Sequence, residues 1–196
     1  MQRLDSVRQN VDVLYSANHL EADQWIHWGY PNHVLVVAEQ TEKLANQHGA
    51  NIELAVTGAL LHDIADAVMS RFNPEHEERS LKIAGDILAK SGFTKDETHF
   101  VREEILRPHS CKKLLPTTIE GKVMATADSM AHFVTDFYLY FCWQNYGPGD
   151  YEDFIEWVPK KIEKDFTRKI FFDDAREAVR PKYEALKILF KAGKDE

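Results

Sequence analysis

The sequence predicts an all-α protein made of a single domain. Apolar residues recur at the three- and four-residue spacing of helices in several separate stretches. Most of these stretches begin at residues that cap helices or at prolines, and several end near glycine or proline. No stretch shows the alternating apolar and polar pattern of a half-buried strand. Because 196 residues is the length of one domain, we expect residues 1–196 to form one helical bundle.

The first three predicted helices follow from local start and stop signals. Pro31 opens a segment whose apolar residues have helical spacing and which ends near Gly49. Asn51 is a suitable N-cap for the second helix. Pro74 stands at the first helical position of the third. These helices are expected at about 31–49, 51–68 and 74–91.

The later helices are predicted in the same way. Thr94 and Glu97 match a capping box, which opens a helix running toward Pro108. Residues 116–118 start a long helix, and the clearest break in the chain is Gly-Pro-Gly at 147–149. Two more helices are expected at about 151–168 and 173–192. We expect this C-terminal part, about 150–194, to pack on a core formed by about 28–135.

The charge and composition narrow the classes of partner. The formal net charge of −8 argues against a nucleic-acid polymer, which needs a positive surface, but it permits a small nucleotide. Cys111 and Cys142 are too few for a disulfide framework, and we expect both to be buried. The chain has no signal-like apolar start and no window of about 20 apolar residues. We therefore expect a cytoplasmic protein with no membrane partner.

The pair His62-Asp63 lies inside an apolar run, 56–65, where an ionised carboxylate would be costly to bury. Such a group is tolerated only when it is paired or bound to a metal. Further imidazole and carboxylate groups occur in separate segments on both sides of the pair. These are His33, His76, His109 and Asp128. A set of this kind predicts a divalent metal site and indicates a metal-dependent hydrolase.

The ligand chemistry indicates the kind of metal. Mixed imidazole and carboxylate ligands favour Mn²⁺, Fe²⁺, Co²⁺, Ni²⁺ or Zn²⁺ over Ca²⁺ or Mg²⁺. On a helix, the side chains of His62 and Asp63 diverge by about 100°. Both can reach an ion between them, with His33 and Asp128 completing the site from neighbouring helices. Asp66 would lie one turn further on the same face, where it could hold or deprotonate a metal-bound water.

These residues resemble the HD-domain phosphohydrolases, whose signature is an ordered His … His-Asp … Asp series on a helical bundle. Here the series is His33, His62-Asp63 and Asp128. Residues 58–64 are similar to the family's "A-x-L-H-D-I" helix, and residues 122–129 are similar to its "A-D" helix. The resemblance covers about residues 28–135. It implies metal-dependent hydrolysis of a phosphoester or phosphoanhydride bond in a small molecule, with a nucleotide favoured.

The resemblance leaves the number of ions at one or two. Family members with extra histidines often hold two metals, and His76 and His109 occupy those positions, with Asp63 bridging the ions. The alternative is that both histidines support one ion or contact phosphate. Where many two-metal members read "H-D-I-G-K", this chain ends the motif at Asp66. That acidic residue resembles the nucleotidase and nucleotide-pyrophosphohydrolase branches, where it serves the attacking water.

For several residues the sequence leaves two roles open. Arg79 and Lys82 are candidates for binding the substrate phosphate, with solvated surface cations as the alternative. The aromatic residues between 133 and 146 are expected in the core, with a base-stacking wall or a homodimer contact as alternatives. For the whole protein, the alternatives to a hydrolase are a metal- and nucleotide-binding regulatory module without turnover, or an HD-fold di-iron oxygenase.

Overall fold

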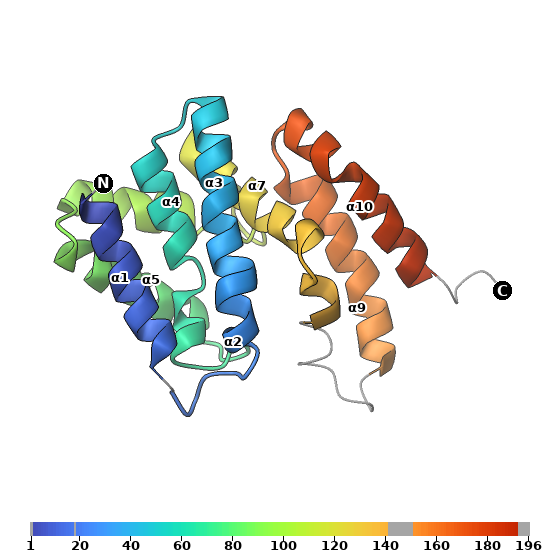
Figure 1. Ribbon diagram of the computed structural model, residues 1–196, viewed down its shortest axis with the longest axis horizontal. Helices are drawn as coiled ribbons and strands as arrows, with labels where there is room; N and C mark the ends of the chain where they lie inside the picture. The colour runs from blue at the N-terminus through green and yellow to red at the C-terminus, as the bar shows by residue number, and fades with distance from the viewer. Residues whose placement is uncertain (1, 18, 141–150, 192–196) are drawn as a thin grey trace.

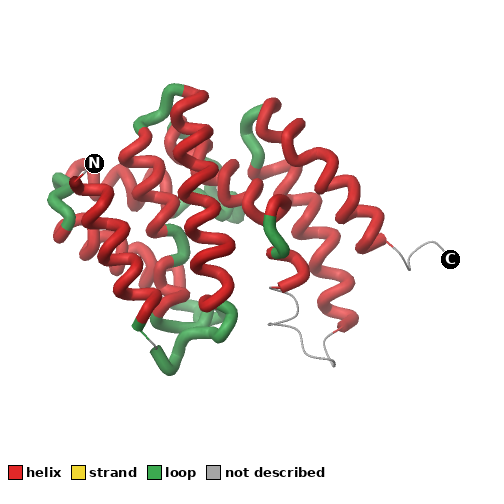
Figure 2. The backbone as a smooth tube through the Cα atoms, viewed as in Figure 1, coloured by secondary structure: helices red, strands yellow, loops and turns green. Residues whose placement is uncertain are grey.

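The computed structural model describes residues 2–17, 19–140 and 151–191, in which helices are joined by loops and no strand occurs (Figure 2). The predicted all-α class is confirmed. Within these residues, no helix is both long and apolar enough to cross a bilayer. The main helices are α1 (Gln2–Ser16), α2 (Ile26–Gly29), α3 (Leu35–His48), α4 (Ile52–Leu61), α5 (His76–Lys90), α6 (Lys95–Phe100), α7 (Ile119–Val134), α9 (Tyr151–Lys164) and α10 (Asp173–Lys191). Four further stretches, of π- or 3₁₀-helical geometry, are η1 (Tyr30–Val34), η2 (Ile64–Ala67), η3 (Val101–Leu106) and η4 (Asp165–Lys169).

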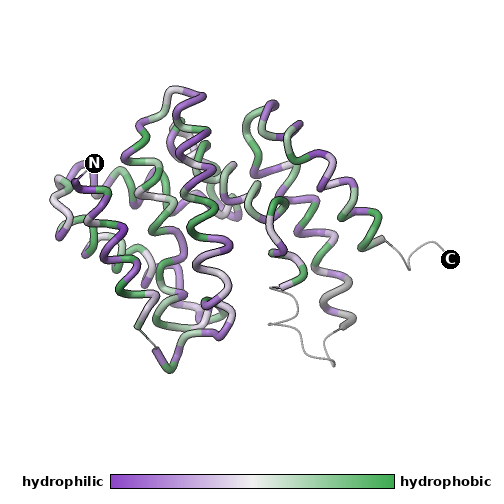
Figure 3. The backbone as a smooth tube through the Cα atoms, viewed as in Figure 1, coloured by the Kyte–Doolittle hydropathy of each residue, from purple (hydrophilic) through white to green (hydrophobic). Residues whose placement is uncertain are grey.

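The centre of the bundle is formed by α3, α4 and α7, each of which packs against the other two (Figure 1). Along α3 and α10, hydrophobic and hydrophilic residues alternate as they do in amphipathic helices (Figure 3). The N-terminal helix α1 packs on α4 and α5 through the buried residues Val7, Val11 and Tyr15. These residues are four positions apart, which is a helical spacing, although no helix was predicted before residue 31.

The C-terminal helices α9 and α10 pack against each other, and α10 and η4 pack against α7 (Figure 1). Phe166 of η4 stacks on Tyr183 of α10 with ring centroids 3.8 Å apart, and Phe133 of α7 meets the same tyrosine at 6.3 Å. The observed bounds agree with the helices predicted at 151–168 and 173–192. The predicted break at 147–149 lies outside the described residues.

The helix that leads to His62 is shorter than predicted. Its expected extension to about Val68 is wrong, because α4 ends at Leu61. His62 has an extended backbone, and Asp63 is left-handed with φ of 53°, a conformation that Asp tolerates better than most residues. The chain then forms the 3₁₀ turn η2. A sharp turn of the backbone at His62 and Asp63, and not a continuous helix, therefore sets the directions of these two side chains.

Gly58 allows α4 to approach η3 closely. A Cβ at this position would lie 2.5 Å from Cγ2 of Ile105, which is closer than carbon atoms can pack. The absence of a side chain at Gly58 thus fixes how α4, which presents His62, sits against the neighbouring helix.

Candidate metal centre

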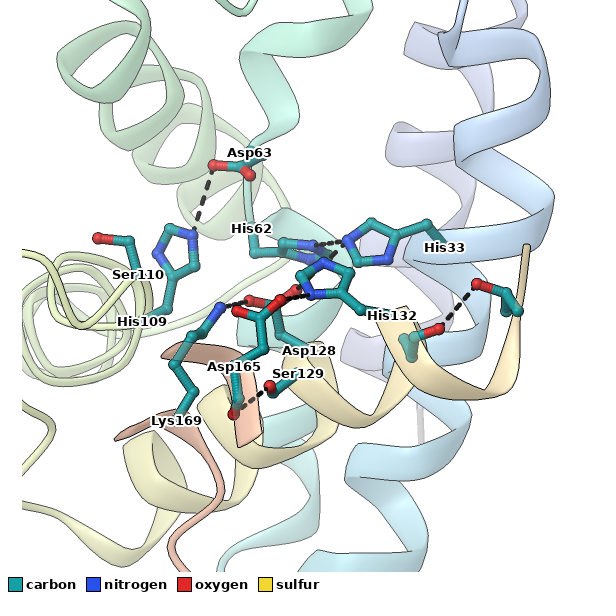
Figure 4. A network of polar contacts seen from close by, with 12 residues as sticks. His33, His62, Asp63, His109, Ser110, Asp128, Ser129, His132, Asp165 and Lys169 are labelled. Atoms are coloured by element: carbon teal, nitrogen blue, oxygen red, sulfur yellow. Dashed lines mark hydrogen bonds and ion pairs between the residues drawn. The ribbon is translucent and has the colours of Figure 1, made fainter. Parts of the chain in front are cut away.

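Three of the predicted ligands converge in the core (Figure 4). His33 comes from η1, His62 from the end of α4 and Asp128 from the middle of α7. One ligand atom from each lies within 4.8 Å of the others. His33 Nε2 is 3.2 Å from His62 Nε2 and 3.4 Å from Asp128 Oδ1. All three side chains are buried, so the fold brings together segments that are far apart in the sequence.

The state of the imidazoles fits a divalent ion at this point. Nδ1 of His62 donates to the carbonyl of Ala59 at 2.6 Å, and a carbonyl can only accept. Burial lowers the pKa of His62 to about 4, so the neutral ring keeps a lone pair on Nε2. Nδ1 of His33 is buried without a hydrogen-bond partner among the described residues. A histidine held through one nitrogen by a backbone carbonyl, with the other facing the site, is typical of metal ligands.

The fourth predicted ligand, Asp63, is not in the group whose ligand atoms lie within 4.8 Å of one another. Its Oδ1 is 3.4 Å from Nε2 of His109 (Figure 4). Its Oδ2 is 3.0 Å from Nη2 of Arg71. Burial would raise the pKa of Asp63, but Arg71 and His109 together hold it well below its usual value. Asp63 is therefore ionised, and it connects the His62 end of the site to His109.

Asp66 is buried, and both of its oxygens are engaged. Oδ1 accepts hydrogen bonds from Nε2 of His76 at 2.7 Å and Nε of Arg71 at 3.2 Å, and Oδ2 pairs with Nη2 of Arg71. The same Arg71 nitrogen contacts Asp63, so one guanidinium joins the two carboxylates. Because α4 ends earlier than predicted, Asp66 reaches this position from η2 and not from the next turn of the same helix.

The two histidines predicted for a second ion differ in their arrangement. Nδ1 of His109 donates to the carbonyl of Leu106, which leaves Nε2 to face Asp63. His62 has the same arrangement, with Nδ1 on a backbone carbonyl and Nε2 facing the site. The ring centroids of His62 and His109 lie 5.9 Å apart. His76, at the start of α5, uses its Nε2 to contact Asp66. His109 is thus oriented as a ligand beside Asp63, whereas His76 is tied to Asp66.

Two residues without a predicted role, Lys169 and His132, adjoin Asp128, and a third, Asp165, contacts His132. Lys169 of η4 forms an ion pair with Oδ2 of Asp128, and His132 Nε2 lies 3.5 Å from Oδ1 of the same carboxylate. Nδ1 of His132 donates to Oδ2 of Asp165 at 2.8 Å (Figure 4). Asp128 and His132 are four residues apart on α7, and Asp165 and Lys169 are four apart in η4. This spacing puts each pair on one face of its own helical segment, but it does not indicate that the two segments meet.

The charges of this cluster are set by burial and by its ion pairs. Burial would raise the pKa of Asp128, but Lys169 and His132 hold it well below its usual value. Burial, together with the nearby Lys161 ammonium, lowers the pKa of His132 to about 3. At neutral pH the cluster therefore consists of an ionised Asp128, a neutral His132 and a charged Lys169.

The predicted phosphate-binding residues lie on the surface of α5. Arg79 and Lys82 are exposed, and Lys82 pairs with Asp86 at 3.0 Å. Among the described residues, neither makes a hydrogen bond or an ion pair with a candidate ligand.

The expectation of core packing is confirmed for Phe133, Phe137 and Tyr138, which are buried. Cys111 is also buried, as predicted. The remaining aromatic residues of that prediction include Tyr140, which stacks on Trp28 at 4.6 Å, and three residues outside the described part of the chain. Those three are Phe141, Trp143 and Tyr146, and Cys142 also lies there.

A family model for the HD domain matches residues 30–132, more than half of the chain. The chain therefore belongs to the HD-domain family, which is a superfamily of metal-dependent hydrolases. Searches of curated proteins and of solved structures found no match. The matched segment holds the four predicted ligands of the first ion, and it ends before Asp165 and Lys169.

Proposed function

We propose that this protein is a metal-dependent phosphohydrolase that cleaves a phosphoester or phosphoanhydride bond in a small molecule, with a nucleotide as the favoured substrate. The observation that carries the proposal is the convergence of His33 Nε2, His62 Nε2 and an Asp128 carboxylate oxygen on one buried point. Membership of the HD-domain family supports the same chemistry. The net charge of −8 favours a small substrate over a nucleic-acid polymer.

The proposed ligands of the first ion are His33, His62, Asp63 and Asp128. A second ion would use Asp63 and His109, together with His76 if that side chain leaves Asp66. The mixed nitrogen and oxygen set suits Mn²⁺, Fe²⁺, Co²⁺, Ni²⁺ or Zn²⁺. A bound metal of this kind lowers the pKa of water toward about 7 and withdraws charge from a phosphoryl oxygen.

The protein's own groups prepare the site for that chemistry. The carbonyls of Ala59 and Leu106 fix which nitrogen of His62 and His109 faces inward. We assign Asp66 the role of orienting the attacking water or accepting its proton. Its link to Asp63 through Arg71 supports this role. The competing role is structural, since Asp66 also anchors Arg71 and His76.

The test is metal analysis of the purified full chain, followed by a panel of phosphate esters and nucleotides with Mn²⁺, Co²⁺, Ni²⁺ and Mg²⁺. His62→Ala should lose the bound metal and the activity together, and its melting temperature should respond less to added metal. His48→Ala is the matched control, because His48 lies at the far end of α3, where it pairs with Asp174. Full metal occupancy in His62→Ala would refute the site. Oxygen consumption by an iron-loaded protein that hydrolyses no phosphate would favour the oxygenase alternative.

A further inference from the structure

Lys169, at the end of η4 between α9 and α10, places one cation in the candidate metal centre. Lys169 is 4% exposed, and its ammonium forms an ion pair with Oδ2 of Asp128 (Figure 4). The other oxygen of this carboxylate, Oδ1, faces His33 at 3.4 Å and His132 at 3.5 Å. Asp128 therefore presents one oxygen to the imidazoles and the other to Lys169, so the ammonium lies next to the point where the ligands converge.

The ammonium of Lys169 has N–H donors that are not used in hydrogen bonds within the described residues. An ammonium carries three N–H groups. Within the described ranges, Oδ2 of Asp128 is the one acceptor to which Lys169 Nζ donates. A buried cation that uses one of three donors is well suited to bind a further anionic group at the same place.

The charge around the site also favours an anion once a metal is bound. Four carboxylates and three cations form the ion pairs at and beside the site. They are Asp63, Asp66, Asp128 and Asp165, and Arg71, Lys161 and Lys169. With the imidazoles counted as neutral, one negative charge remains, and a divalent ion would convert it into one positive charge. Buried charge of this kind needs a partner, and a phosphate group supplies one.

The position of Lys169 is fixed by the surrounding backbone. The hydroxyl of Ser129 donates to the carbonyl of Asp165 at 2.7 Å, and the amide of Phe171 donates to Oγ1 of Thr126 at 3.1 Å. Both contacts join α7 to the segment that carries Lys169, one on each side of it. The ammonium is thus held in place before a ligand arrives, which reduces the entropy lost on binding.

We propose that Lys169 is the cation that binds the substrate phosphate in this site, a role for which Arg79 and Lys82 were the candidates in the sequence. Those two side chains are exposed on α5, and Lys82 is paired with Asp86. The inference rests on the proposed phosphohydrolase function, and it makes the C-terminal helices part of the active site. A purely structural Lys169 would neutralise Asp128 and contact no substrate.

Inorganic phosphate is the probe, titrated calorimetrically into the full chain after its metal content has been measured. Lys169→Met should retain the metal and weaken phosphate binding by about 10- to 100-fold, the loss expected for one charge-assisted hydrogen bond. Lys160→Met is the matched control, because it also removes a lysine from the C-terminal segment, but one that is exposed on α9 and pairs with Glu156. Its affinity for phosphate should stay within about threefold of wild type.

Phosphate affinity in Lys169→Met within twofold of wild type would overturn the inference. If that variant does not fold, Lys169→Gln answers the same question, because it keeps a donor for Asp128 without the charge. The outcome is separate from that of the proposed function. Phosphate binding that depends on Lys169, in a protein that hydrolyses no member of the substrate panel, would support the inference and refute the activity.

Discussion

Gly58→Ala tests the packing that positions the His62 end of α4. In an open helix, replacing Gly with Ala stabilises by about 1 kcal/mol. Here the new Cβ would lie 2.5 Å from Cγ2 of Ile105, and overpacking of this kind costs about 1–3 kcal/mol. The net effect on the free energy of unfolding should therefore range from about zero to a loss of about 2 kcal/mol.

The sign should reverse when the obstructing atom is removed. Ile105→Ala deletes Cγ2 and leaves Cβ at 3.4 Å from the new methyl group, which is an ordinary contact. In that background, Gly58→Ala should stabilise by about 1 kcal/mol. The coupling between the two positions should then be about 1–3 kcal/mol. Gly85→Ala is the matched control, because its Cβ would meet Arg102 at 3.5 Å, and it should stabilise by about 1 kcal/mol in either background.

Urea unfolding followed by far-ultraviolet circular dichroism measures all four members of the cycle under the same conditions. If the free energy of unfolding falls with urea concentration at the same slope in each variant, each exposes the same amount of surface on unfolding. Ile105→Ala alone should cost about 2–5 kcal/mol, so the cycle needs a correspondingly stable wild type. A coupling below about 0.5 kcal/mol would show that α4 and η3 are not in close contact at Gly58.

Two further predictions concern the chemistry of the site. Asp66→Asn should keep the fold and the metal but lower kcat by about 10²- to 10⁴-fold at saturating metal, whereas near-normal turnover with reduced stability would show that Asp66 only anchors Arg71 and His76. His109→Ala should reduce the metal stoichiometry by one ion, measured by elemental analysis, if His109 and Asp63 hold a second metal. An unchanged stoichiometry would leave a single ion at the first site.

The parts of the fold that the sequence predicts well are those set by local chemistry. Thr94 and Glu97 form the predicted capping box, and α10 begins at Asp173 as expected. The end of α4 was not predicted, because buried apolar residues continue through η2 and hide the break at Asp63. The left-handed backbone of Asp63 leaves no distinct pattern of apolar spacing.

The candidate site was also predictable only in part. His33, His62 and Asp128 could be named because their residue types and order are those of a metal-binding set. The ion pair of Lys169 with Asp128 could not be predicted, because it depends on the docking of a segment 41 residues away. The pairing of Asp66 with Arg71 could not be predicted either, because Arg71 lies in the loop between η2 and α5, where no periodicity applies.

The pairing of Asp128 with Lys169 has a consequence for the order in which the protein is assembled. At a synthesis rate of roughly 5–20 residues per second, the 41 residues that separate them are made in roughly 2–8 s. During that interval, His33, His62 and Asp128 already exist in the chain, but the cation that balances Asp128 does not. A fragment ending with the matched family segment at residue 132 would bury Asp128 without Lys169, at the cost of an uncompensated charge. The charge of Asp128 is therefore balanced within the protein only after the segment that carries Lys169 has been made and has docked on α7.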